Sequence, residues 1–282
     1  MKTLWLLLAT ALLPACAGIP APASRLHAAN ELADAKGWRM ERIDAGDFSL
    51  TAWRPERFVP SERLTVYIEG DGFAWITGSQ PSPDPTPIDP LALRLALAQP
   101  DGNAAYLARP CQFAEAETRG CAQAYWTGQR FAPAVIEAAQ RAIDVLKNRA
   151  GARRLTLVGY SGGGAVATLV AAERHDVDRL VTVAGNLDHR RWTALHRVSP
   201  LTGSRNAADV AGALGDIRQW HFVGGKDQVI PPQLAQSFAD RFPAANRPRV
   251  IVEADYDHRC CWADGWSRLW QKTQFQPTPG AN

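Results

Sequence analysis

The sequence predicts an α/β domain with a mostly parallel, eight-stranded sheet and helices on both of its faces. Eight short runs rich in β-branched and aromatic residues alternate with helical patterns along the 282-residue chain, as in layered domains with right-handed crossovers. The central runs are almost continuously apolar, which is typical of strands buried on both faces of a sheet. With 46% apolar and 21% charged residues, the composition suits one domain with a substantial core.

The expected strands are mostly separated by stretches long enough to hold crossover helices. The first two are the exception, because only Asp-Ala-Gly-Asp, a turn signal, separates them. We therefore expect these two to form an antiparallel hairpin at one edge of the sheet. The eight strands are expected at Arg39–Ile43, Phe48–Trp53, Leu64–Ile68, Ala104–Ala108, Leu155–Gly159, Leu180–Ala184, Arg218–Val223 and Arg249–Val252.

Helices are expected between these strands. Val135, Ile136 and Ile143 recur at helical spacing after Pro133, and proline is favoured in the first turn of a helix. The Pro-rich stretch Gly78–Pro90 is too stiff for a helix, and we expect a surface loop there. The expected helices are Pro90–Ala98, Pro133–Ala150, Pro231–Phe242 and Asp264–Lys272, with a further one in the apolar run after Ser161.

The first sixteen residues have the features of an export signal. Lys2 precedes an apolar stretch that is too short to span a bilayer and that ends in small residues, the layout of a signal peptide. The segment Leu13–Cys16 resembles the lipobox of bacterial lipoproteins, which implies that residues 1–15 are removed and that Cys16 carries a lipid anchor in the cell envelope. Pro14 is unusual in that motif, so cleavage by an ordinary signal peptidase, giving a soluble periplasmic or secreted protein, stays open.

The rest of the chain divides into a tether and one domain. The residues after Cys16 are rich in proline and alanine, and we expect residues 16–37 to form an extended linker to the lipid anchor. The domain is expected over residues 38–282. No internal repeat interrupts it.

In an exported protein the four remaining cysteines are expected to pair. Cys111 and Cys121 flank a polar stretch, and we expect a disulfide between them that closes a surface loop. The adjacent Cys260 and Cys261 form a vicinal disulfide or stay reduced. No C-x-x-C spacing or histidine pair accompanies them, so they do not indicate a metal site.

The segment from Gly159 to Gly163 matches the G-x-S-x-G pattern of a nucleophile elbow, with Ser161 at its centre. An expected buried strand precedes it and an expected helix follows, so the serine would sit on a sharp turn above the sheet. Such a turn brings backbone atoms close together, and the two outer glycines make room for it. The helix start supplies N–H groups and a positive dipole end, which favour developing negative charge.

A serine nucleophile needs a base, and the base needs an orienting acid. Asp227 lies in the turn after the seventh expected strand, and His258 follows the eighth. The order Ser161, Asp227, His258 is the one found in α/β-hydrolases. The chain resembles the α/β-hydrolase fold family from about Trp38 to the C-terminus, which implies that these three residues form a catalytic triad.

The resemblance also implies an oxyanion hole made by two backbone N–H groups. One belongs to Gly162, and the other comes from the loop after the third strand. Similar enzymes often carry His-Gly ahead of the second donor, whereas this chain has Glu69-Gly70-Asp71-Gly72. By position the N–H of Asp71 is the expected donor, with Gly72 as the alternative. The Asp71 side chain is expected either to point outward or to bind a positively charged part of the substrate.

The acidic member of the triad has alternatives. Asp227 can also be interpreted as the cap of the helix that begins near Pro231. Asp257 is its main rival, but it is adjacent to His258 in sequence and so is poorly placed to face the same imidazole.

The histidine has alternatives as well. His221 lies inside an expected strand and fits the core better than a site. His189 and His196 fall in Asn186–Ala208, where this fold inserts its lid. Because this insertion is short, we expect a small flap, a fairly open site and contact between His196 and the substrate.

These observations predict an exported serine hydrolase that cleaves a small-molecule carboxylic ester without a cofactor or metal. A peptidase or amidase on the same triad is one alternative, and a non-catalytic, lipid-anchored binding protein on a hydrolase scaffold is another. The net charge of only +3, with no long basic run, argues against nucleic-acid binding. The pocket size depends on which of four aromatic side chains point inward: Trp75, Trp126, Tyr160 and Trp192.

Overall fold

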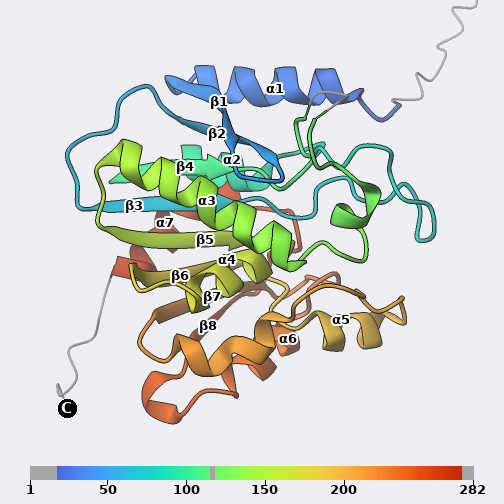
Figure 1. The fold of residues 1–282 in the computed structure, drawn as a ribbon. Coiled ribbons are helices and arrows are strands. Elements are labelled where there is room, and N and C mark those ends of the chain that lie inside the picture. The colour runs from blue at the N-terminus through green and yellow to red at the C-terminus, as the bar shows by residue number, and fades with distance from the viewer. Residues whose placement is uncertain (1–17, 115–117, 275–282) are drawn as a thin grey trace, which may run out of the picture.

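The computed structural model describes residues 18–114 and 118–274 and confirms the predicted fold class. Eight strands form one sheet in the order β1-β2-β4-β3-β5-β6-β7-β8 (Figure 1). The six strands from β3 onward pair in parallel, while β1 and β2 form the predicted antiparallel edge hairpin. The predicted signal peptide, residues 1–15, and Cys16 lie outside the described residues.

All eight predicted strands are present, with ends displaced by a few residues at most. The strands are β1 Trp38–Asp44, β2 Ser49–Pro55, β3 Arg63–Ile68, β4 Asn103–Leu107, β5 Arg154–Tyr160, β6 Val177–Val183, β7 Arg218–Gly224 and β8 Arg249–Glu253. Their side chains alternate between the two faces of the sheet, as the pleat requires. In β3, for example, Val66 and Ile68 belong to the apolar cluster on one face, and Tyr67 belongs to the cluster on the other.

The helices cover both faces of the sheet (Figure 1). Helices α3 and α4 pack on one face, and α1, α2 and α7 pack on the other. The α-helices are α1 Pro22–Asp34, α2 Leu91–Leu97, α3 Pro133–Ala150, α4 Gly162–Ala172, α5 His189–His196, α6 Pro232–Ala239 and α7 Trp262–Gln274. Three short 3₁₀ helices are η1 Gln123–Trp126, η2 Ala207–Leu214 and η3 Ala244–Asn246.

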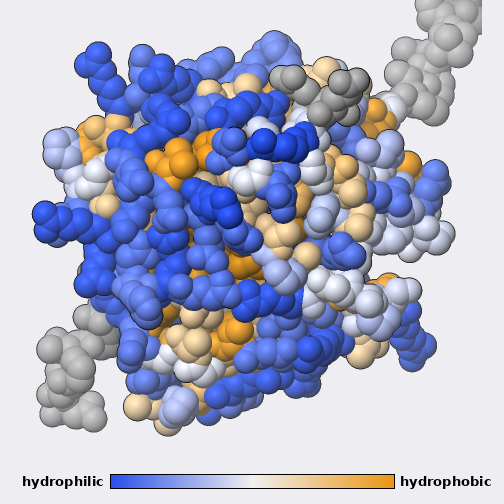
Figure 2. All heavy atoms as spheres, in the orientation of Figure 1, coloured by the Kyte–Doolittle hydropathy of each residue, from blue (hydrophilic) through white to orange (hydrophobic). Residues whose placement is uncertain are grey.

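The face of the molecule seen in Figure 2 is mainly hydrophilic, with small and separate apolar areas. Within residues 18–114 and 118–274, no helix combines the length and the apolar character needed to cross a membrane.

Helix α3 shows how residues in the local sequence determine where a helix begins and ends. It begins with Pro133 at its first turn and ends at Gly151, which takes a left-handed conformation with φ 62°, as helix C-termini often do. Val135, Ile136 and Ile143 are buried, and Ile136 and Ile143 belong to the apolar cluster on the face of the sheet that α3 covers. The predicted spacing is confirmed here.

The expectation of an extended linker over residues 16–37 is wrong for most of its length. Residues 22–34 form helix α1, in which Ala29 and Ala33 are fully buried against the domain. Proline and alanine favour this outcome, because Pro22 stands in the first helical turn and alanine is the strongest helix former. The folded domain therefore begins near Pro22, and not at residue 38.

The Pro-rich stretch Gly78–Pro90 is a loop, as predicted, but part of it is buried. Pro85 and Thr86 are covered, and Arg25 of α1 donates a hydrogen bond to the Thr86 carbonyl. Arg25 also lies 3.4 Å from Asp84. Helix α1 thus holds this loop against the sheet.

The cysteine pairs lie in two loops. Cys111 and Cys121 are joined by the predicted disulfide, with Cα atoms 5.4 Å apart, a normal separation for such a bond. A second disulfide joins the adjacent residues Cys260 and Cys261, and the peptide bond between them is cis.

Candidate active site

Ser161 occupies the turn between β5 and α4. Its backbone has φ 51° and ψ −120°, a conformation that side-chain-bearing residues rarely adopt and that recurs at functional sites. A Cβ on Gly159 would lie 2.5 Å from Gly164 Cα, and a Cβ on Gly163 would lie 2.9 Å from the Glu69 carbonyl carbon. The steric reason predicted for the two elbow glycines is confirmed by these contacts.

Ser161, His258 and Asp227 are joined in one chain of hydrogen bonds. His258 Nε2 lies 3.0 Å from Ser161 Oγ, and His258 Nδ1 lies 2.9 Å from Asp227 Oδ2. In the neutral imidazole, Nδ1–H then donates to the carboxylate and Nε2 accepts from the serine hydroxyl. This is the arrangement in which a histidine can remove the serine proton.

The Asp227 carboxylate is buried, and hydrogen bonds to both of its oxygens fix its orientation. Its Oδ1 accepts hydrogen bonds from the N–H groups of Val229 and Ile230, both at 2.8 Å, which leaves Oδ2 for His258. These bonds close the turn after β7, and α6 begins at Pro232 without a side-chain cap. The helix-cap interpretation of Asp227 is therefore wrong.

Asp257 turns away from the imidazole that it follows in sequence. Its Oδ1 accepts hydrogen bonds from the N–H groups of Arg259 and Cys260, both at 2.7 Å. Those two bonds, which lower the pKa of the Asp257 carboxyl, close the turn that carries His258. Asp257 thus shapes the loop and does not face the reacting atoms.

The three other candidate histidines lie outside this hydrogen-bonded chain. His221 is fully buried in β7, with Nδ1 2.8 Å from Thr182 Oγ1, and burial lowers its pKa to about 3, which confirms the core interpretation. His189 is buried at the start of α5. His196 Nε2 lies 2.9 Å from the Val229 carbonyl oxygen, so that nitrogen is already engaged within the protein.

The segment between β6 and β7 carries the 3₁₀ helix η2 and, ahead of it, the eight-residue helix α5. Trp192 Nε1 donates to the Val229 carbonyl at 2.8 Å, the same oxygen that His196 contacts. The helix is thereby tied to the loop that carries Asp227. Of the other aromatic candidates, Tyr160 packs its ring 5.4 Å from that of His258, and Trp75 is 38% exposed.

The loop after β3 carries the expected second oxyanion donor. The N–H groups of Asp71 and Gly162 make no hydrogen bond to any other described residue, so both are available to a substrate oxygen. Gln112 holds this loop, because its Nε2 donates to the Gly70 carbonyl at 2.9 Å and its Oε1 accepts from Arg109 N at 3.0 Å. Sequence reasoning missed Gln112, which lies beside the Cys111–Cys121 disulfide.

No protein-family model and no curated protein matches this sequence, but solved structures match its fold. An esterase from Pyrococcus furiosus superposes with a TM-score of 0.60 at 14% identity, covering 93% of this chain and 96% of that one. Est1E from Butyrivibrio proteoclasticus gives 0.58 at 12% identity, covering 83% and 98%. An α/β serine hydrolase homologue from Coxiella burnetii gives 0.55 at 14% identity, covering 83% and 94%. The chain has the α/β-hydrolase fold.

In this α/β-hydrolase fold the candidate residues all follow parallel strands at their carboxyl ends. Asp71 follows β3, Ser161 follows β5, Asp227 follows β7 and His258 follows β8. Loops at this edge of a parallel sheet meet above the strand ends, where open α/β sheets bind their ligands. The topology therefore brings together residues that are far apart in the sequence.

The Asp71 side chain does not point outward, and it is not free for a cationic substrate. Its Oδ2 lies 2.5 Å from an Arg130 guanidinium nitrogen, and its Oδ1 lies 3.4 Å from Arg109. Burial acts to raise the pKa of the Asp71 carboxyl, but the two arginines outweigh burial and lower it. Both predicted alternatives for this side chain are wrong, because its charge is already paired inside the protein.

Arg109 and Arg130 are the functional candidates that the sequence interpretation passed over. One signal was present: Arg109 stands two residues beyond the apolar strand β4, at the edge where ligands bind. Nothing local to Arg130 marks it, since it lies between η1 and α3. Its contact with Asp71 spans 59 residues of sequence.

Glu69 takes the place of the histidine that similar enzymes carry. Its side chain is buried, and Oε1 accepts a hydrogen bond from Gly70 N at 2.8 Å. Burial raises the pKa of the Glu69 carboxyl to about 7. The charge beside the oxyanion loop therefore changes within the physiological pH range.

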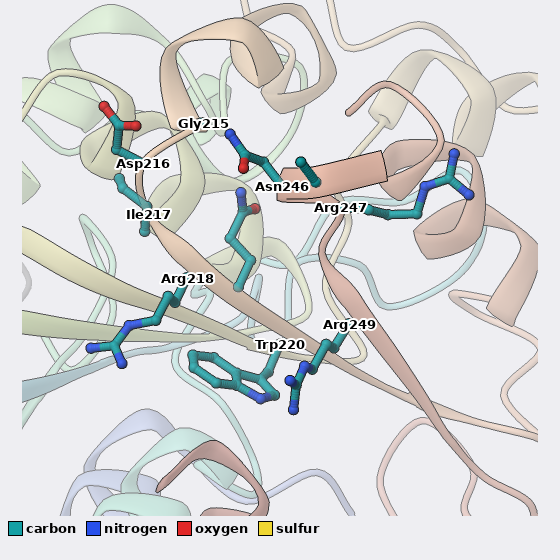
Figure 3. Close-up of a pocket in the computed structure, with 10 residues that line it drawn as sticks. Gly215, Asp216, Ile217, Arg218, Trp220, Asn246, Arg247 and Arg249 are labelled. Atoms are coloured by element: carbon teal, nitrogen blue, oxygen red, sulfur yellow. The ribbon is translucent and has the colours of Figure 1, made fainter. Parts of the chain in front are cut away.

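A hollow of about 370 Å³ lies at the opposite edge of the sheet, where β7 and β8 begin (Figure 3). Arg218, Trp220 and Arg249 line it, and the side chains of Arg218 and Arg247 point away from one another. None of the candidate catalytic residues lines this hollow. The candidate active site therefore lies at the carboxyl edge, where the hydrogen-bonded residues are, and not at this hollow.

Proposed function

We propose that this protein is an exported serine hydrolase that cleaves carboxylic esters. The observation that carries the proposal is the hydrogen-bonded chain from Ser161 through His258 to Asp227, set on a nucleophile elbow. The fold supports it but does not by itself determine a reaction. The Pyrococcus furiosus protein that shares this fold is named as an esterase.

The proposed reaction has two steps. Ser161 Oγ attacks the acyl carbonyl carbon while its proton passes to His258 Nε2, and Asp227 stabilises the resulting imidazolium. The carbonyl electron pair moves to oxygen, which the N–H groups of Gly162 and Asp71 bind. Collapse of this intermediate expels the alkoxide, which takes the proton from His258. Water then attacks the acyl-enzyme by the same route and frees Ser161.

We favour an ester over an amide as the substrate. An alkoxide leaves with less help from an acid than an amine does, and the structure presents a single candidate proton donor, His258, at the serine among the described residues. The alternative is tested directly by comparing a panel of p-nitrophenyl esters with aminoacyl anilides. Faster turnover of the anilides would replace the esterase proposal with a peptidase or amidase.

A fluorophosphonate probe tests the class of protein. The folded wild type should be labelled, Ser161→Ala should not, and Ser199→Ala, which changes an exposed serine of the α5 segment, should be labelled like the wild type. An unlabelled wild type would favour a binding protein on a hydrolase scaffold. Equal labelling of all three would place the nucleophile elsewhere.

We also propose that the protein is lipid-anchored through Cys16, which rests on the sequence of the first sixteen residues. Metabolic labelling with an alkyne fatty acid should mark the wild type in the envelope fraction. Cys16→Ser should abolish that label. Recovery of unlabelled wild type from the soluble exported fraction would support cleavage by an ordinary signal peptidase.

A further inference from the structure

A cluster of three charged side chains, two of them buried arginines, lies beside the elbow, and these side chains have no part in the reaction described so far. It contains Asp71, Arg109 and Arg130. The two arginine side chains are only 5% and 6% exposed, which is rare for arginine unless the charge is paired or used. Here two arginines contact one carboxylate, and the Glu69 carboxyl is close enough to Arg109 to influence its pKa.

The cluster is held by directed hydrogen bonds. Arg130 Nε donates to the Thr127 carbonyl at 2.7 Å, and Arg109 donates to the Arg130 carbonyl. Arg109 Nε is buried without a hydrogen-bond partner among the described residues. The arginines are therefore fixed by the backbone around them, and they in turn fix the Asp71 carboxylate.

The Asp71 carboxylate packs directly against Gly162, one of the two expected oxyanion donors. A Cβ on Gly162 would lie 2.7 Å from Asp71 Cγ and would overlap a carboxylate oxygen. Asp71 thus fills the space that a side chain at residue 162 would take. The two residues in contact are the same two whose N–H groups are free to bind the oxyanion.

A bare carboxylate at this position would oppose catalysis. Negative charge develops on the substrate oxygen in the transition state, and like charges repel strongly where water is excluded. His258 is close enough to contribute to the lowered pKa of Asp71, so the carboxylate lies within electrostatic range of the reacting groups. Its charge must be cancelled for the hole to work.

We propose that Arg130 and Arg109 form a cationic support behind the oxyanion hole, where they hold the Asp71 carboxylate against Gly162 and cancel its charge. The inference rests on the proposed function. Both arginines are positioning residues, since they act through their contacts with Asp71. Arg130 carries most of the effect because its contact with Asp71 is the shorter of the two.

The test is rescue of one substitution by another. Arg130→Met keeps the side-chain volume, removes the charge and exposes the oxyanion to Asp71, and it should lower kcat by about 100-fold, comparable to losing one oxyanion donor. Asp71→Asn in the Arg130→Met background removes the uncompensated charge. It should recover at least about tenfold in kcat, with KM changing little.

Arg174→Met is the matched control. Arg174 has a side chain only 10% exposed and is paired with Asp176 and Asp144, but it lies at the other edge of the sheet. It should keep the kcat of the wild type even if it melts at a lower temperature. Fluorophosphonate titration of active sites corrects each kcat for the folded fraction.

The outcomes separate this inference from the proposed function. A wild type that neither turns over esters nor is labelled overturns the proposed function. An active wild type, with Arg130→Met unaffected or with no recovery from Asp71→Asn, overturns only the charge-cancelling role. If Arg130→Met does not fold, Arg109→Met provides the test, because Arg109 makes the longer contact with Asp71. Arg109→Met should lower kcat by about tenfold. Asp71→Asn in that background should then recover kcat.

Discussion

Each of two opposite edges of the sheet carries an ion cluster in which one aspartate pairs with two basic side chains. At the carboxyl edge Asp71 lies between Arg109 and Arg130, and at the amino edge Asp176 lies between Arg174 and Lys147. Both aspartate side chains are 20% exposed. What differs is the surroundings of each cluster.

At the amino edge the charges balance, because Arg174 also pairs with Asp144 at 2.7 Å. At the carboxyl edge two buried arginines share one carboxylate beside the nucleophile. A charge imbalance is costly in a buried place and tends to be kept where the charge is used. If the proposed role of the carboxyl-edge cluster holds, similar ion pairs stabilise the fold at one edge and support a reaction at the other.

The largest expected contrast is between two histidines. His258→Ala removes the proposed base and should lower kcat by about 10⁴-fold or more. His175→Ala changes an exposed histidine next to the amino-edge cluster and should leave kcat unchanged. Steady-state ester hydrolysis measures both. Near-normal turnover by His258→Ala would rule out the triad as described.

The next contrast concerns packing beneath the elbow. Gly163→Ala places a Cβ against the backbone of Ile68 and Glu69 and should destabilise the protein by about 3 kcal/mol, as overpacked cores do. Gly212→Ala, with nothing within 4 Å of its added Cβ, should stay within about 0.5 kcal/mol of the wild type. Urea unfolding measures both, and equal stabilities would contradict the close approach of β3 and α4.

Glu69 should make stability depend on pH. Burial raises its pKa from 4.5 to about 7, so the folded protein holds the Glu69 proton more tightly than the unfolded chain does. The resulting stabilisation is fully present below pH 4.5 and is lost as the pH rises toward 7. Glu69→Gln should remove this dependence, which for the wild type amounts to about 3 kcal/mol. Unfolding curves at several pH values test it, and parallel pH profiles for the two proteins would contradict it.

The smallest expected effect concerns Asp176 at the amino edge. There the stability falls as the pH is lowered, which is opposite to the dependence expected for Glu69. The hydrogen bonds from Arg174 and Lys147 outweigh burial and lower the pKa of Asp176 to about 2. Its contribution is therefore present above pH 3.8 and is lost as the pH falls toward 2. Asp176→Asn should cost about 1 kcal/mol or less at neutral pH, since solvent screens the pair. A loss of kcat in this variant would break the comparison between the two edges.

The fold and the triad geometry could be expected from local patterns in the sequence. Continuous apolar runs mark strands buried on both faces, and the glycines around Ser161 mark a turn that tolerates no side chains. Asp227 and His258 could be found because they follow strands in a known order. The strand and elbow signals are local, and the acid and base were found from their order after successive strands.

The parts that sequence reasoning missed depend on contacts that no local pattern records. The Asp71 carboxylate meets Arg109 across 38 residues and Arg130 across 59, and arginine is usually a surface residue. Helix α1 was missed for another reason. Its proline and alanine fit both a tether and a helix, and only packing of Ala29 and Ala33 against the domain decides between them.

Helix α1 also sets how far the enzyme could move from a membrane. If Cys16 is the anchored residue, only the six residues ahead of Pro22 remain as a leash, with a reach of about 20 Å when fully extended. A domain tethered by so short a segment would stay within about 20 Å of the bilayer. Esters held in or near the envelope lipids would then be within its reach, while those deeper in the surrounding fluid would have to diffuse to it.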